Sequence, residues 1–185
     1  MLLFGVCSSV VCRGSVVPRW DERHPSQEVS EGLIGRWIAG ALGDGERSRL
    51  AYVEELPDES LETTGGFLRR AWRFYAGHGP TIERILTDNG GCYWSAAFAE
   101  ACDELGIGRR FTRPYRPQTN GEAERIVRTL LAEWAYVRPF ADTAERTASL
   151  ARFLDCYGRE RPHWSLAGQS PISLTPVHNP VGKNT

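Results

Sequence analysis

The pattern of apolar and polar positions divides this chain of 185 residues into three zones. In residues 1–47 neither a helical nor an alternating pattern continues for more than a few positions, although the segment Met1–Cys12 is apolar. From residue 48 onward, short apolar runs alternate with segments in which apolar residues recur every three or four positions. We therefore predict one domain over residues 48–175, between a poorly patterned, degraded or non-native region at 1–47 and a tail at 176–185.

Strands and helices follow each other along the predicted domain. Strand candidates lie at residues 49–56, 84–88 and 108–113. Helical spacing predicts helices over residues 59–76, 95–106 and 120–137, and a last helix from Asp142 through at least Tyr157. Ser95, Asn120 and the capping-box pair Asp142–Glu145 are residue types that begin helices. This alternation predicts an α/β layered domain.

Each predicted helix has one apolar stripe that we expect to face the core. The stripe residues are Phe67, Leu68, Ala71, Trp72 and Tyr75 in the first helix, Phe98, Cys102 and Leu105 in the second, Ala123, Val127, Leu130 and Trp134 in the third, and Leu150, Leu154 and Tyr157 in the last.

Composition narrows the function classes. Hydrophobic residues make up 41% of the chain, and no apolar run approaches the roughly 18 residues that a membrane helix needs. The net charge of −1 excludes a uniformly basic nucleic-acid binder but allows a local basic face. The five cysteines include no C-x-x-C pair, and the first segment lacks the basic start and cleavage site of a signal peptide. We expect a protein of the reducing cytoplasm with no membrane partner.

Two carboxylates are the candidate metal ligands. Asp88 follows an apolar strand, and strand ends are the usual place for ligands in α/β sheets. Glu124 lies in the first turns of a predicted helix that the intervening chain can fold back beside that strand. Carboxylate oxygens suit Mg²⁺, and paired ions roughly 4 Å apart activate the attacking oxygen in phosphodiester chemistry. Taken singly, Asp88 also fits an ordinary surface turn, and Glu124 fits an ion pair with Arg128.

The segment between the two carboxylates favours a polyanionic ligand. No acidic residue occurs from Gly106 to Gly121, whereas arginines occur at Arg109, Arg110, Arg113 and Arg116, and again at Arg125 and Arg128. Guanidinium groups bind phosphate oxygens well, and Gln118 and Asn120 add groups that can contact a DNA backbone or base edge. The alternative is a solvated loop that Pro114 and Pro117 merely stiffen.

Two motifs in this region resemble a known family. Leu86-Thr87-Asp88-Asn89-Gly90, and the stretch from Arg113-Pro114-Tyr115 to Glu124-Arg125, are similar to the catalytic core of DDE transposases and retroviral-type integrases, above all bacterial insertion-sequence transposases. The two acids are separated by residues 89–123, 35 in all, which is the spacing typical of the family. Segments 48–53 and 157–171, the latter with Arg161-Pro162-His163, resemble further family motifs, so the resemblance covers residues 48–175.

The resemblance implies an RNase H-like, three-layer fold: a mixed sheet with helices on both faces. It implies a transposase or integrase that cleaves and transfers DNA strands with Mg²⁺ or Mn²⁺, with Asp88 and Glu124 as the second and third acids. Asn89, Gly90, Gln118 and Asn120 would shape or contact the site. The implied partners are transposon ends, target DNA, and further copies of this chain or of a full-length transposase.

The sequence departs from the family pattern at its start. Family members carry a first catalytic Asp on an N-terminal strand, and here Asp21, Asp44 and Glu46 are the candidates, or the acid is absent. We expect a truncated or frameshifted N-terminus with the first strands missing or degraded. Three hypotheses stay open: a strand-transferring enzyme, an inactive remnant that binds only DNA or a transposase, and a chain that does not fold stably because a sheet edge is exposed.

Overall fold

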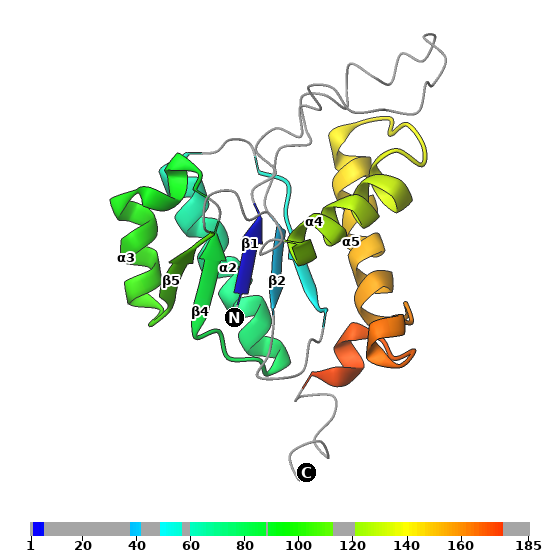
Figure 1. Cartoon of the computed structure of the whole chain (residues 1–185). Coiled ribbons are helices and arrows are strands. Elements are labelled where there is room, and N and C mark those ends of the chain that lie inside the picture. Colours follow the sequence, from blue (N-terminus) through cyan, green and yellow to red (C-terminus); the bar gives the residue numbers. More distant parts are fainter. Residues whose placement is uncertain are drawn as a thin grey trace.

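The computed structural model describes residues 2–5, 38–41, 49–56, 60–87, 89–112 and 121–175, with the backbone alone for 2–5, 38–41 and 121–124. Five short strands form one sheet in the order β3-β2-β1-β4-β5 (Figure 1). The strands are β1 (Leu2–Gly5), β2 (Ile38–Ala41), β3 (Ala51–Val53), β4 (Arg84–Thr87) and β5 (Gly108–Phe111). Neighbours β1–β2 and β2–β3 are antiparallel, whereas β1–β4 and β4–β5 are parallel, so the sheet is mixed as predicted.

The first two strands correct the prediction that the N-terminal strands are missing or degraded. β1 lies in the middle of the sheet, where Leu3 pairs with Gly40 of β2 and with Leu86 of β4. A central strand presents a short apolar run rather than an alternation, and periodicity alone cannot identify a run of four residues as a strand. The boundary at residues 47–48 stays a prediction, because residues 6–37 and 42–48 lie outside the described part of the chain.

Two helices cover one face of the sheet. Helix α2 (Leu61–His78) begins at Ser60, whose hydroxyl accepts from the Thr63 amide at 3.2 Å, and ends at Gly79 in the left-handed conformation with φ 97°. Helix α3 (Ala96–Glu104) is capped by Ser95 as predicted, with its hydroxyl 3.2 Å from the Phe98 amide. The predicted stripes of both helices are buried here, apart from the partly buried Trp72 and Leu105.

Helices α4 and α5, described below, cover the opposite face. Helix α4 (Gly121–Leu130) contacts β1 and β2 and continues as a π-helical turn, Leu131–Ala135, so it ends slightly before the predicted Val137. Helix α5 (Thr143–Arg159) contacts β3, and short 3-10 turns follow at Trp164–Leu166 and Pro171–Leu174. Leu130, Trp134 and Leu150 form the core of this layer. The cap Asn120 and the side chain of Ala123 lie outside the described part.

Strand β3 shows that the two helical layers lie on opposite faces. Tyr52 packs with the α2–α3 core, and its neighbour Val53 packs with the α4–α5 core, because successive side chains of a strand point to opposite faces. Helices therefore cover both faces of the sheet, as predicted. Among the described helices, none is long and apolar enough to cross a membrane.

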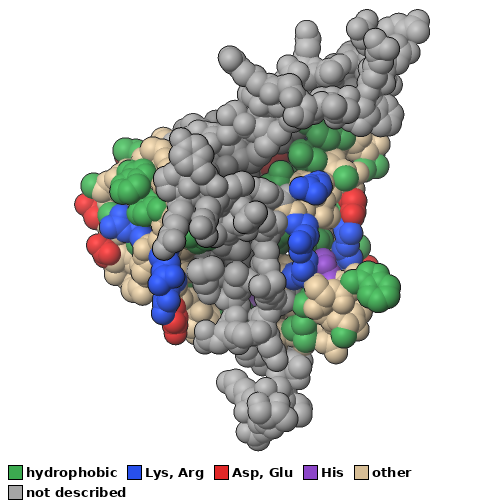
Figure 2. Space-filling model, viewed as in Figure 1, with side chains coloured by type: hydrophobic (Ala, Val, Ile, Leu, Met, Phe, Trp, Pro, Cys, Tyr) green, Lys and Arg blue, Asp and Glu red, His purple; other side chains and the backbone are tan. Residues whose placement is uncertain are grey.

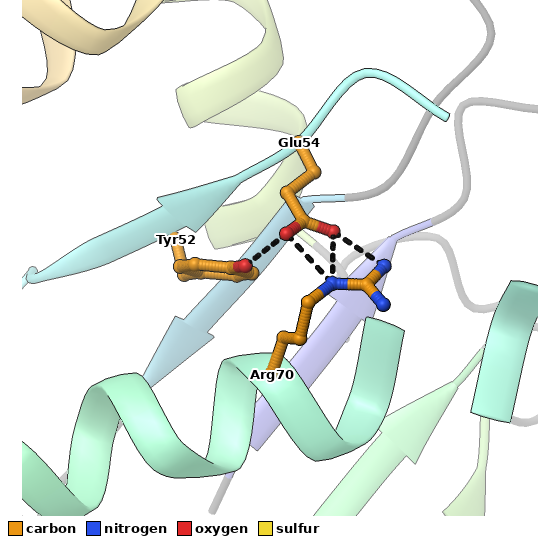
Figure 3. A network of polar contacts seen from close by, with 3 residues as sticks. All are labelled: Tyr52, Glu54 and Arg70. Carbon is orange, nitrogen blue, oxygen red and sulfur yellow. Dashed lines mark hydrogen bonds and ion pairs between the residues drawn. The ribbon is translucent and has the colours of Figure 1, made fainter. Parts of the chain in front are cut away.

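Polar contacts at the end of β3 attach the first helical layer. The Glu54 carboxylate accepts the Tyr52 hydroxyl and binds the Arg70 guanidinium of α2, with Nε–Oε1 and Nη2–Oε2 both 2.8 Å (Figure 3). Burial first, and then the hydrogen bond to Glu54, raise the pKa of Tyr52. This network fixes α2 relative to the edge of the sheet.

Candidate functional site

The carboxyl ends of β4 and β5 meet at one edge of the sheet. Thr87 and Phe111 are register partners, and the Thr112 amide donates to the Thr87 carbonyl oxygen at 2.8 Å. The exposed Asn89 donates from Nδ2 to the Thr112 carbonyl oxygen at 3.2 Å, so it joins the turn after β4 to the chain after β5. DNA contact by Asn89 stays a prediction. Asp88, between Thr87 and Asn89, lies outside the described residues.

Glu124 belongs to the first turn of α4, which contacts β1, the direct neighbour of β4. Its side chain lies outside the described part, so the separation of the two predicted acids stays a prediction. The topology brings α4 to the strand beside the one that Asp88 follows.

The described arginines of the predicted DNA-binding set are all exposed. Arg109 and Arg110 lie on β5, and Arg125 and Arg128 lie on α4. The first two lie on the strand that pairs with β4, and the other two lie on the helix that contacts β1 and β2. Arg113, Arg116, Gln118 and Asn120 fall outside the described residues.

Arg109 is also close to α3. Burial raises the pKa of the Cys102 thiol of α3 to about 11, and the positive charge of Arg109 opposes that shift. Residues 109 and 111 share one face of β5, so Arg109 and Phe111 lie on the α3 side of the strand.

Sequence reasoning missed a second basic group, formed around the end of α5. The ring of Tyr157 lies 4.9 Å from the ring of His163, edge to face, and the Arg161 guanidinium carbon lies 5.7 Å from the Tyr157 ring. Arg49 acts electrostatically on both Tyr157 and His163, and Arg125 acts on Tyr157. Figure 2 shows basic side chains gathered, with a histidine among them, over the side of the molecule that carries α4 and α5.

Some polar atoms of this basic group have hydrogen-bond partners, and others have none among the described residues. Arg161 is held by Glu133, with Nη2–Oε1 at 2.7 Å, and this bond raises the pKa of Arg161. Burial first, and then Arg161 and Arg49, lower the pKa of His163. The buried atoms His163 Nε2 and Arg49 Nε have no hydrogen-bond partner among the described residues. Arg49 also has φ 55°, in the left-handed region that residues other than glycine rarely adopt.

The residues of this group lie in motifs that the sequence shows, but the sequence does not show that these motifs come together in space. Residues 48–53 and 157–171 were both recognised as family-like segments, yet about a hundred positions separate Arg49 from Tyr157 and His163. The packing of α5 on β3 brings them together, and no local pattern encodes that contact.

The predicted metal ligands fit a divalent cation by their chemistry. Two carboxylates provide hard oxygen ligands and leave the remaining positions to water and phosphate, which is what Mg²⁺ favours. Among the side chains that the structure describes, no three of His, Cys, Asp and Glu gather where they could hold a metal ion. Asp88 and Glu124 stay the predicted ligands.

Comparison with known proteins decides the family. Two family models, both described as integrase core domain, match residues 46–117 and residues 105–171. Together they cover residues 46–171, about two thirds of the chain, and include Asp88 and Glu124. The chain belongs to the integrase core family. The resemblance to DDE-type transposase and integrase catalytic cores is thereby confirmed.

Curated relatives of this integrase core are insertion-element proteins. It is 27% identical over 177 residues to the InsD protein of insertion element IS2E of Escherichia coli (strain K12), covering 86% of this chain and 81% of that protein. Over the same length it is 27% identical to the transposase InsD for insertion element IS2D of the same strain, but spans only 59% of that relative. These relatives support a function in DNA integration, as the motifs predicted.

Solved integrase structures share the fold. The catalytic core domain of BIV integrase matches with a TM-score of 0.57 at 23% identity, covering 75% of this chain and 83% of that one. A simian T-cell lymphotropic virus intasome in complex with PP2A regulatory subunit B56 gamma matches with the same TM-score at 21% identity. This match covers 76% of this chain and 48% of that one. The predicted RNase H-like α/β fold is confirmed.

Proposed function

We propose that this integrase core acts in DNA integration by divalent-metal-dependent cleavage and transfer of DNA strands. The observation that carries the proposal is that 35 residues separate Asp88 from Glu124 inside the matched region, one after β4 and the other in the first turn of α4. The geometry of β4 and β5 supports it, because strand ends at one edge are where α/β sheets bind ligands.

Each part of the site has a proposed role. Asp88 and Glu124 would hold Mg²⁺ or Mn²⁺, which when bound activates the attacking oxygen and stabilises the leaving one. Arg109, Arg110, Arg125 and Arg128 are exposed and would bind phosphates on either side of that position, and we add Arg49 to them. Arg113, Arg116, Gln118 and Asn120 would contact the DNA from the segment between. The substrates would be transposon ends and target DNA, held by more than one copy of the chain.

The decisive experiment is a nicking and strand-transfer assay on DNA that carries the cognate element ends. We expect activity with Mg²⁺ or Mn²⁺ that is lost in Asp88→Asn and in Glu124→Gln. The exposed α3 residues Asp103 and Glu100 provide matched controls, and Asp103→Asn and Glu100→Gln should retain activity. Activity that survives both Asp88→Asn and Glu124→Gln would refute the catalytic proposal.

A second candidate function is DNA binding without catalysis. The specific observation that favours it is that β1, the N-terminal strand beside β4, consists of Leu2, Leu3, Phe4 and Gly5 and carries no carboxylate. The first acid of the family stands on an N-terminal strand, and two carboxylates hold paired ions less well than three. Asp21, Asp44 and Glu46, the other candidates for that acid, lie outside the described residues.

This binding function predicts salt-sensitive, weakly sequence-selective affinity for DNA. Replacing Arg109, Arg110 and Arg113 together with Gln should weaken binding and lower the slope of log Kd against log salt by about 0.9 for each phosphate that is no longer neutralised. Arg73→Gln, an exposed arginine on α2, is the control for the loss of one positive charge. An unchanged affinity and salt slope in the triple variant would exclude these residues as the groups that bind DNA.

A further inference from the structure

An aromatic pair lies at the edge of the sheet where β4 and β5 end. The rings of Trp94 and Phe111 are stacked, with centroids 4.0 Å apart and planes only 6° from parallel. Trp94 is nevertheless 62% exposed, whereas Trp134 in the core is 9% exposed. Phe111 thus covers one face of the indole, and the other face is open to solvent.

Both rings are held by anchored backbone. Trp94 ends a 3-10 turn, Gly91–Trp94, and the next residue, Ser95, caps α3 and donates from its hydroxyl to the Cys92 carbonyl oxygen at 2.7 Å. Phe111 is the last residue of β5 and is partly buried against the α2–α3 core. An aromatic surface that is fixed before binding loses little conformational entropy when a flat ligand stacks on it.

The pair lies beside the proposed catalytic position. Phe111 is the register partner of Thr87, the residue before Asp88. The Asn89 amide bonds to Thr112, directly after Phe111, and Trp94 follows five residues after Asn89. A DNA strand whose phosphate lies at the end of β4 would therefore pass within reach of the indole.

The surroundings carry the charge that a nucleic acid strand requires. Arg109 and Arg110, which directly precede Phe111 on β5, are exposed and form no ion pair with another described residue. Figure 2 shows exposed hydrophobic side chains next to basic ones over the side of the molecule that carries α3 and β5. Aromatic faces combined with backbone-binding cations are the usual means of holding single-stranded nucleic acid.

We propose that Trp94, supported by Phe111, is a stacking platform for an unpaired base of the DNA strand bound at the end of β4. The proposal rests on the proposed function, since it assumes DNA at this edge. An unpaired base offers a free face for stacking, whereas a base inside a duplex is already stacked on its neighbours. The platform would keep a DNA end frayed and its terminal phosphodiester accessible.

The test compares two fluorescein-labelled probes at one salt concentration: a blunt 20-base-pair duplex and the same duplex with a three-nucleotide single-stranded overhang. We expect the full-length chain to bind the overhang probe more tightly, and Trp94→Ala to lose roughly tenfold on that probe while keeping its affinity for the blunt one. Trp94→Phe should retain most of the preference. Trp164→Ala, which removes a fully exposed indole at another place, is the matched control and should behave as the parent.

A spectroscopic measurement separates stacking from a structural effect. With 2-aminopurine in the overhang, stacking on the indole should quench its emission, and the quenching should disappear in Trp94→Ala while circular dichroism stays unchanged. Equal binding of the two probes by the parent, equal loss on both probes in Trp94→Ala, or a self-association that Trp94→Ala abolishes would each overturn the platform. If the parent binds neither probe, the proposed function itself fails; if it binds both equally, only the platform fails.

Discussion

At the scale of single residues, the most buried charges in the described chain belong to an ion pair between α5 and the segment after β3. Arg146 Nε lies 2.7 Å from Glu55 Oε1, and the two side chains are only 6% and 14% exposed. Thr147 donates from its hydroxyl to Glu55 Oε2 at 3.1 Å, and the Arg146 guanidinium lies 5.3 Å from the Trp134 ring. The pair therefore joins α5 to the segment after β3, and Arg146 also contacts the π-helical turn that carries Trp134.

Removing one member of this ion pair should destabilise the folded chain. Arg146→Ala leaves the Glu55 carboxylate buried without its counter-ion, and we expect the free energy of unfolding to fall by about 3 kcal/mol or more. Urea denaturation of the parent and of the variant measures this difference in the free energy of unfolding. Arg152→Ala, an exposed position on the same helix, should change stability by less than about 0.5 kcal/mol. A small effect of Arg146→Ala would show that the pair does not hold α5 in place.

His163 should make stability depend on pH. Its pKa in the folded chain is lowered from 6.5, so the unfolded chain binds more protons between these two values. This contribution to stability is present above about pH 6.5 and is lost as the pH falls toward the folded pKa. We expect urea midpoints to fall between about pH 7.5 and pH 5.5, and to fall less in His163→Gln. Identical pH dependence in the two proteins would contradict this role.

At the scale of elements, local sequence decided where most helices begin. Ser60, Ser95 and Asp142 cap the three helices whose starts are fully described, and two of these caps were predicted from sequence. Asp142 Oδ1 accepts from the Glu145 amide at 2.7 Å, and Glu145 Oε2 accepts from the Ala141 amide at 2.6 Å. The hydrogen bond from the Ala141 amide first, and then the one from Arg138, lower the pKa of Glu145. Caps are predictable because both partners lie within four residues.

The Asp142 cap should contribute measurably to α5. Asp142→Ala leaves the Glu145 amide without its acceptor, and we expect a loss of about 1 kcal/mol in the free energy of unfolding, most of it restored in Asp142→Ser. Asp155→Ala, which removes an exposed ion pair with Arg159 on the same helix, should cost less than about 0.5 kcal/mol. Equal effects of the two alanine substitutions would contradict the capping argument.

Strands were predicted less well than helices. The three strands expected after residue 48 exist, but β3 and β5 are shorter than the segments predicted for them. A strand extends only as far as its neighbours can pair with it, and β3 pairs with β2 only from Ala51 to Val53. Apolar content shows that a segment is buried, but the partner strand decides where the ladder stops.

At the scale of the whole molecule, β1 connects the two halves of the sheet. It pairs with β2 on one side and with β4 on the other, so without it the β3–β2 pair would separate from the β4–β5 pair. The hypothesis that the chain does not fold stably assumed an open edge at this place. With β1 in position, both of its neighbours are covered, and we expect cooperative unfolding.

This role of β1 can be tested at Leu3, which faces partners on both sides. Leu3→Pro removes a backbone donor from a central strand, and we expect the free energy of unfolding to fall by roughly 2–4 kcal/mol with loss of cooperativity. Leu3→Val keeps the backbone donor and should unfold cooperatively, as measured by thermal circular dichroism. If Leu3→Pro unfolds like the parent, the first five residues do not contribute to the sheet.

The sequence by itself determined the helical stripes and caps, the spacing of Asp88 and Glu124, and the family. Each depends on residues close together in the chain or on a motif that can be read in order. Only the tertiary structure placed β1 and β2 in the sheet, brought Arg49 to His163, and stacked Trp94 on Phe111. These contacts join segments from 17 to more than a hundred residues apart. Their formation depends on which strands pair and which helices pack together, and no local pattern carries that information.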